Sequence, residues 1–146
     1  MIQQYILKFI LIFLFISIIL FIISIFIELP GSISGVVTIA CATFATAIKF
    51  VTEQKRIPDK AEKRQLVWGC FLSAFILSTV LSFLIFMYQV DFNFGVVKEL
   101  INSLLTALPL WILFVGITIS LLIQYFLISY GFGGFAKSQL NKLSKK

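Results

Sequence analysis

The side chains that could do acid–base or ionic chemistry are concentrated in the stretch Lys49–Trp68, which reads KFVTEQKRIPDKAEKRQLVW. It holds nine of the charged residues, including the acids Glu53, Asp59 and Glu62. The chain has no histidine, which removes the general base of most nucleophile–base pairs and a common zinc ligand. Acids interleaved with cations favour a solvated, salt-bridged face over a metal site. We therefore expect no enzymatic activity, no metal and no cofactor.

The glycine-rich run Gly131–Gly134 is a second feature that resembles a chemical motif. Phosphate-binding loops place their glycines between a strand and a helix. Here an apolar stretch precedes the run and Lys137 follows it soon after. We interpret the run as the end of a helix.

Outside these polar stretches the chain is mostly hydrocarbon, with 60% hydrophobic residues and a mean hydropathy of +1.08. Soluble domains contain about 45–50% apolar residues, and the charge here is confined to connections. The predicted fold class is all-α, an integral membrane bundle of four transmembrane helices. We expect one transmembrane domain over 1–146, with spans at about 9–27, 33–50, 66–90 and 109–130, a cytoplasmic loop at 51–65 and a basic tail at 131–146.

Prolines and capping patterns predict where the later helices begin. Asp59 followed by Glu62 resembles a capping box just after Pro58, so the helix that runs into the third span should begin there. Pro109 occupies a favoured first-turn position of the fourth span. Between these two helices, apolar residues on one face of 91–107 predict a short helix in the outer membrane interface.

The second span is rich in small residues. Gly31 and Gly35 form a GxxxG pair, and Thr38, Ala42 and Thr46 continue the spacing of four. Small residues let helix backbones approach closely in lipid, where packing must replace the hydrophobic drive. We therefore expect this span to be the most protein-covered helix of the bundle.

Gln124 is the deep polar side chain of note in the fourth span. We expect it to hydrogen-bond across helices, for instance to a threonine or serine of the second span. A transporter would need an ionisable group in mid-membrane, at about 3 kcal/mol each on insertion scales. Glu28 and Lys49 instead lie at the ends of their helices. This pattern argues against a transporter.

The basic residues are divided unequally between the two sides of the membrane. Four spans place the N-terminus, the loop 51–65 and the tail on one side, and Lys98 on the other. The first side then has ten basic residues against one. Because basic connections are retained on the cytoplasmic side, we predict that both termini are cytoplasmic.

Because no enzymatic activity is expected, we consider functions that depend on binding a partner. Cations near a membrane surface attract anionic head groups at up to about 1 kcal/mol each. The expected contacts with a lipid or a protein partner are the five cations of the loop: Lys55, Arg56, Lys60, Lys63 and Arg64. A nucleic-acid partner is not expected, because the basic residues lie beside apolar spans. Membrane lipids, a protein partner and further copies of the chain all stay open.

Two stretches, Lys49–Phe71 (KFVTEQKRIPDKAEKRQLVWGCF) and Tyr130–Leu140 (YGFGGFAKSQL), resemble a family of small four-helix inner-membrane proteins of Acinetobacter-type bacteria. The family pattern is E-Q-K-R-x-P, then E-K-x-x-L-V-W-G-C, then a glycine-aromatic stretch ending in A-K-x-Q-L. The resemblance covers nearly the whole length. It implies four helices and an association with cell-envelope integrity, and it carries over no catalytic residue.

The predicted function is that of a non-enzymatic inner-membrane protein that binds a lipid or protein partner and supports cell-envelope integrity. Two other classes fit the sequence. An immunity protein against a pore-forming toxin would carry its specificity in the helix faces or in the outer connections, Glu28–Ser32 and Asp91–Ser103. A holin-like pore former would collapse the membrane potential when expressed.

Overall fold

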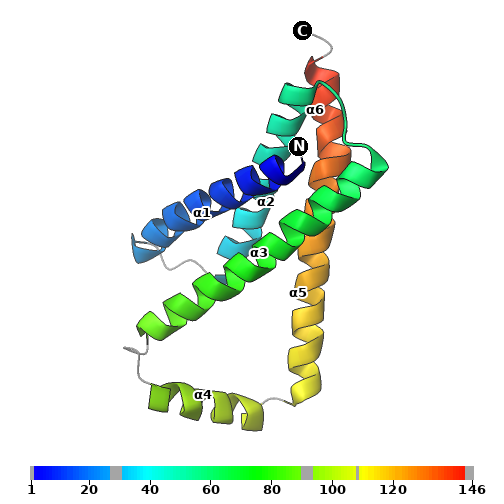
Figure 1. The fold of residues 1–146 in the computed structure, drawn as a ribbon. Coiled ribbons are helices and arrows are strands. Elements are labelled where there is room, and N and C mark those ends of the chain that lie inside the picture. Colours follow the sequence, from blue (N-terminus) through cyan, green and yellow to red (C-terminus); the bar gives the residue numbers. More distant parts are fainter. Residues whose placement is uncertain (1, 27–30, 90–93, 108, 144–146) are drawn as a thin grey trace. The chain divides into compact units, whose positions relative to one another are not determined.

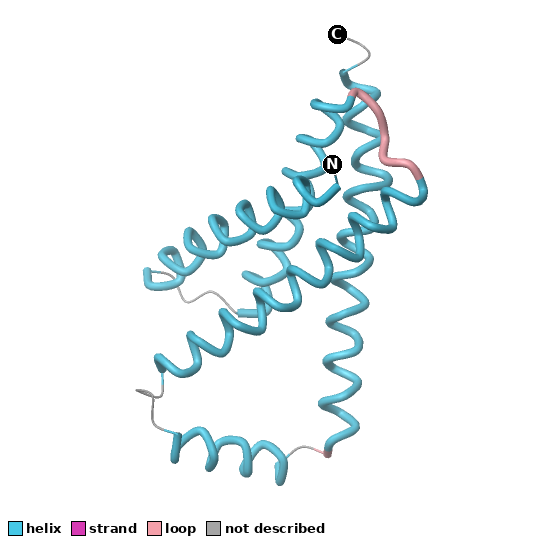
Figure 2. The backbone as a smooth tube through the Cα atoms, in the orientation of Figure 1, coloured by secondary structure: helices cyan, strands magenta, loops and turns pink. Residues whose placement is uncertain are grey.

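The computed structural model describes residues 2–26, 31–89, 94–107 and 109–143 (Figures 1 and 2). Helices make up 95% of this part of the chain, and none of it is in a strand. The all-α prediction is confirmed. The elements are α1 (Ile2–Phe26), α2 (Gly31–Gln54), α3 (Lys60–Gln89), α4 (Phe94–Ala107), α5 (Leu110–Tyr130), the π-helix η1 (Gly131–Phe135) and α6 (Ala136–Leu143).

Four helical stretches are long and apolar enough to cross a membrane: Ile2–Ser24, Ser34–Gln54, Lys60–Tyr88 and Leu110–Leu143. Their number is the predicted one, but the helices continue past the predicted spans into the charged sequence. Absence of charge marks the apolar centre of a span, whereas a helix continues as long as its backbone hydrogen bonds do. The predicted spans thus cover the apolar part of each helix and not its whole length.

Contacts between residues divide the chain into two compact units. Unit 1 is Met1–Phe75 with Gln124–Lys146, and contains α1, α2, the first part of α3, the last turns of α5, η1 and α6. Unit 2 is Ile76–Ile123, and contains the rest of α3, α4 and the first part of α5. In unit 2 almost every described side chain of α5 is exposed, as expected for apolar helices in contact with hydrocarbon.

The core of unit 1 is built around α2, which packs against α1, η1 and α6. In its most apolar window 44% of the residues are buried, against at most 17% in the other three candidate spans. The prediction that the second span is the most protein-covered helix is confirmed. Its fully or nearly fully buried side chains are Thr38, Ile39, Ala42, Thr43, Thr46, Ala47, Phe50 and Val51.

The threonines of α2 satisfy their hydroxyl groups within the helix. Thr38, Thr43 and Thr46 each donate a hydrogen bond of 2.7–2.8 Å to the carbonyl four residues earlier. The polar atom is then paired locally, and the methyl group is left for packing. This face of α2 therefore behaves as a surface of small apolar groups.

The glycine run after α5 continues the helix, so its interpretation as a helix end was wrong. All its glycines have negative φ, and the segment forms the π-helix η1, which α6 extends. Gly131 and Phe132 are buried. A Cβ on Gly131 would collide with the Thr43 methyl group. Close packing on α2 thus overrides the low helix propensity of glycine, which is about 1 kcal/mol per residue.

The connection between α2 and α3 is only Lys55–Asp59. Lys55 ends α2 in the left-handed region at φ 51°, with its N–H donating to the Val51 carbonyl at 2.9 Å. At the start of α3 the Asp59 N–H donates to the Glu62 carboxylate at 3.1 Å. This bond is the reciprocal half of a capping box, so the predicted helix start is confirmed.

Candidate functional site

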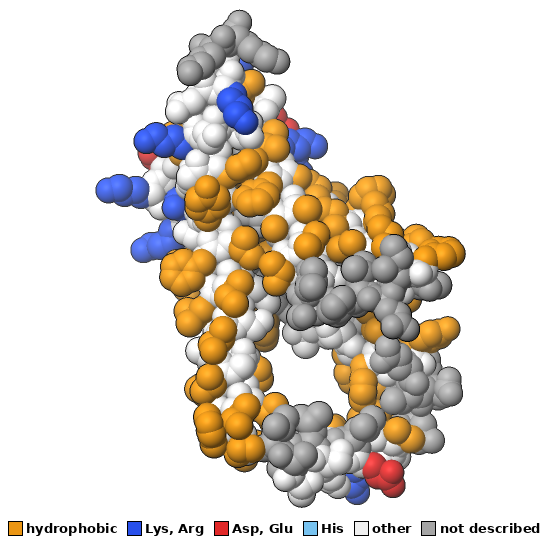
Figure 3. Space-filling view, turned by 180° about the vertical axis from the view of Figure 1, so that it is seen from behind, with side chains coloured by type: hydrophobic (Ala, Val, Ile, Leu, Met, Phe, Trp, Pro, Cys, Tyr) orange, Lys and Arg blue, Asp and Glu red, His pale blue; other side chains and the backbone are white. Residues whose placement is uncertain are grey.

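The charged residues of unit 1 gather where four segments meet: the start of α1, the end of α2, the start of α3, and η1. Contacts between residues distant in sequence fix this meeting. Lys8 of α1 pairs with Glu53 of α2, and Lys63 of α3 lies against Gly133 of η1. Lysine and arginine side chains cluster at this end of the unit (Figure 3). We call it the charged end.

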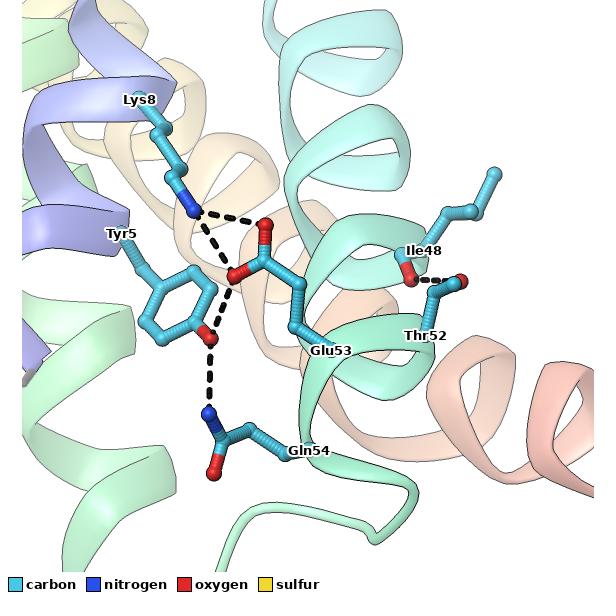
Figure 4. A network of polar contacts seen from close by, with 6 residues as sticks. All are labelled: Tyr5, Lys8, Ile48, Thr52, Glu53 and Gln54. Atoms are coloured by element: carbon cyan, nitrogen blue, oxygen red, sulfur yellow. Dashed lines mark hydrogen bonds and ion pairs between the residues drawn. The ribbon is translucent and has the colours of Figure 1, made fainter.

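A polar network joins α1 to α2 at the charged end (Figure 4). The Lys8 Nζ donates to both oxygens of Glu53 at 2.8 Å. The buried Tyr5 hydroxyl donates to Glu53 Oε2 at 2.8 Å and accepts from Gln54 Nε2 at 3.1 Å. Glu53 is thus occupied by two partners from α1, and its charge is balanced within the protein.

The carboxylate of Glu62 is also paired with a cation of the same chain. Arg56 donates two hydrogen bonds to Glu62, at 2.7 and 2.8 Å, in a bidentate pair, and Glu62 also accepts from the Asp59 N–H. The hydrogen bonds to Glu62 raise the pKa of Arg56. This pair ties the short connection to the first turn of α3. Arg56 is therefore held in a structural pair, although the sequence placed it among the partner contacts.

The other four cations predicted to contact a partner divide into two groups. Lys63 is half-buried, and its Nζ lies 2.6 Å from where a Cβ on Gly133 would be. Lys55, Lys60 and Arg64 are exposed, and no ion pair or hydrogen bond links their side chains to another described residue. The neighbouring Glu53 and Glu62 are already paired and Asp59 makes no ion pair with these cations, so the three positive charges stay exposed.

An aromatic cluster includes the residues that follow the cations along α3. Trp68 and Phe71 of α3 each lie with their ring centroids 6.1 Å from that of Tyr125 in α5, and Trp68 lies 5.9 Å from Phe71. Trp68 and Tyr125 lie far apart in the sequence, so spacing alone does not pair them. Only the packing of α5 beside α3 within unit 1 brings the two together.

The residues expected to pack the helices have different environments. Thr38, Ala42 and Thr46 are buried. Gly35 lies in open space, since a Cβ added to it would have no heavy atom within 4 Å, and the surroundings of Gly31 lie outside what the structure describes. The close contact of α2 is instead at Thr43, which meets Gly131.

Gln124 does not make the expected bond to a threonine of α2. The hydroxyls of Thr38, Thr43 and Thr46 donate to their own helix, and the Gln124 Oε1 is buried with no hydrogen-bond donor among the described residues. Back-bonding within a helix competes with cross-helix bonds for threonine hydroxyls, and this competition is the physical reason for the difference.

The arrangement supports ionic binding. In the part of the chain that the structure describes, no three cysteine or acidic side chains lie close enough to hold a metal ion. Two of the carboxylates at the charged end are paired with cations. Searches against protein-family models, curated proteins and solved structures find no match to this chain.

Proposed function

We propose that this chain is a non-enzymatic multi-pass protein of the bacterial inner membrane that binds a lipid or protein partner through its charged end. Both termini lie in the cytoplasm, and the bound partner supports cell-envelope integrity. The resemblance to small inner-membrane proteins of Acinetobacter-type bacteria motivates the location and the envelope role.

One observation carries the binding proposal. Glu53 and Glu62 are each held by a cation of the same chain, at 2.8 and 2.7 Å, while Lys55, Lys60 and Arg64 stay exposed. Positive charge is therefore presented on a structured platform, where anionic groups can bind without breaking an internal ion pair. A flexible basic tail would need no such ordering.

The segments at the charged end also support the proposed orientation. The start of α1, the end of α2, the start of α3 and η1 meet in unit 1 through contacts. They are the segments that the excess of basic residues assigns to the cytoplasm. The contacts support a common side for these segments, and the excess of basic residues favours the cytoplasm for that side.

The test is complementation of a deletion strain under envelope stress, for example growth in detergent. We expect the wild-type gene to restore resistance, and the triple variant Lys55→Gln, Lys60→Gln, Arg64→Gln to fail although it inserts normally. The matched control, Lys98→Gln, Lys137→Gln, Lys142→Gln, removes the same charge elsewhere and should restore resistance. An inserted triple variant that protects as well as wild type, or a deletion without an envelope defect, would overturn the proposal.

A further inference from the structure

The face of α3 that points away from the core of unit 1 carries an ordered set of exposed side chains. Lys60, Arg64, Trp68 and Leu72 recur at every fourth position and are all exposed. Residues four apart are neighbours on a helix surface, so the four form one inclined row. The opposite side of the same turns holds the buried Leu66, Val67, Cys70 and Ala74.

The row changes in polarity along its length. It begins with two cations in the first turns of α3, continues with Trp68, and ends with Leu72, whose side chain is 54% exposed. Tyr125 of α5 lies beside the middle of the row, because it contacts Trp68 and Phe71. Tryptophan and tyrosine rings favour the level of the lipid glycerol and ester groups.

This sequence of groups matches one phospholipid molecule laid along the helix. A phosphate needs cations, the ester region needs amphipathic rings, and the acyl chain needs exposed aliphatic surface. Lys60 and Arg64 make no ion pair or hydrogen bond to another side chain in the described part of the protein, and guanidinium groups bind phosphate oxygens in a bidentate manner. An acidic soluble protein would match the cations but not the apolar surface that continues from them.

We propose that the row Lys60–Arg64–Trp68–Leu72, with Tyr125 beside it, binds one anionic phospholipid from the surrounding bilayer. The phosphate lies at Lys60 and Arg64, the glycerol region at Trp68 and Tyr125, and an acyl chain along Leu72. This inference rests on the proposed function and names its partner as a lipid.

The test is native mass spectrometry of the full chain released from nanodiscs that contain both phosphatidylethanolamine, which is zwitterionic, and phosphatidylglycerol, which is anionic. We expect wild type to retain one phosphatidylglycerol per chain in preference to phosphatidylethanolamine. Removing both cations in Lys60→Gln, Arg64→Gln should lower that preference by roughly 30-fold, since each cation near a membrane surface contributes about 1 kcal/mol.

Three variants sharpen the result. The control Lys137→Gln, Lys142→Gln removes the same charge from α6 and should leave the preference unchanged. The exchange Lys60→Arg, Arg64→Lys keeps both charges and should preserve it, while Trp68→Leu should reduce retention of either lipid without altering the preference for the anionic one. Equal loss in the α6 control, or no preference in wild type, would overturn the site.

Failure of this proposal is distinguishable from failure of the proposed function. If the triple variant loses envelope protection but wild type binds no lipid selectively, the charged end binds a protein and the lipid site is wrong. If selective lipid binding depends on Lys60 and Arg64 while the deletion has no envelope defect, the lipid site holds and the envelope role is wrong.

Discussion

Glu53 shows how single residues determine the charge that unit 1 presents. It accepts hydrogen bonds from Tyr5 and Lys8, which reach it from α1. Without Glu53, Lys8 would add its charge to the exposed surface and the buried Tyr5 hydroxyl would lose its acceptor. The residue thus both joins two helices and limits which cations are free to bind.

Tyr5→Phe tests the stabilising part of that role. The Tyr5 ring is buried, and its hydroxyl donates to Glu53 and accepts from Gln54. Losing a buried hydrogen-bonding group costs about 0.5–1.5 kcal/mol. We expect a loss of that size in the free energy of unfolding, measured by titration with sodium dodecyl sulfate in mixed micelles. In a double-mutant cycle with Glu53→Gln the two losses should not be additive; additive losses would show that the hydroxyl and the carboxylate are not coupled.

The sequence predicted part of this residue-level pattern. The capping pair Asp59 and Glu62 could be recognised because both partners lie within one turn. The pairing of Glu53 with Lys8 could not, because 45 residues separate them. Which cations would be free for binding was therefore open until the contact of α1 with α2 was known.

At the scale of elements, η1 joins the C-terminal segment to α2. Gly131 faces Thr43 and Phe44, and Phe135 stacks near Phe44 with ring centroids 4.6 Å apart. Gly133 leaves room for the Lys63 side chain of α3. Gly131 thus allows close packing against α2, and Gly133 allows it against α3. Residues four apart rotate slowly around an α-helix, and the wider turn of a π-helix reduces that rotation. Ile128, Phe132 and Ala136 therefore stay on one side and are all buried.

Gly131→Ala tests this packing. The added methyl group would overlap the Thr43 methyl group, which itself lies in a fully buried side chain. Overpacking of this kind costs about 1–3 kcal/mol, and we expect that loss in the free energy of unfolding. The control Gly35→Ala places its methyl group where no heavy atom lies within 4 Å, so it should be neutral or stabilising by up to about 1 kcal/mol. Equal effects of the two variants would contradict the packing of η1 on α2.

The sequence predicted which helices are present, because a long charge-free run or a capping pair involves residues that are close together in the chain. The four apolar stretches were predicted in this way, and the short helix α4 was predicted from the apolar residues on one face of 91–107. The π-helix was missed because three glycines in five residues resemble a helix end, and the sequence does not show that they pack against α2. Its only local hint was the alternation of glycine with phenylalanine, which packing on α2 explains afterwards.

At the scale of the whole molecule, the orientation of the chain can be measured directly. In a background with Cys41→Ala and Cys70→Ala, single cysteines replace Lys98 in α4 or Lys142 in α6, both of which are exposed. We expect a membrane-impermeant maleimide to label Lys98→Cys in intact spheroplasts and Lys142→Cys only after lysis, because basic segments are retained in the cytoplasm. The reverse labelling would invert the proposed topology and remove the charged end from the cytoplasm.

Fold class and the number of apolar helices followed from composition, because hydrocarbon and charge are so sharply separated in this chain. The proposed binding residues did not follow, because they depend on which charges are paired within the protein. Lys55, Lys60 and Arg64 differ from Arg56 and Lys63 only in their neighbours. Neighbours set by tertiary contact cannot be ranked from spacing alone.

The contact between Gly131 and Thr43 has a consequence for biosynthesis. A ribosome makes α2 before η1, so the buried face of α2 has no partner from Gly131–Phe135 until that segment has been synthesised. Until Gly131–Phe135 emerges, that face of small groups lacks the neighbour that covers it. The charged end therefore cannot be complete before Gly131–Phe135 has been synthesised.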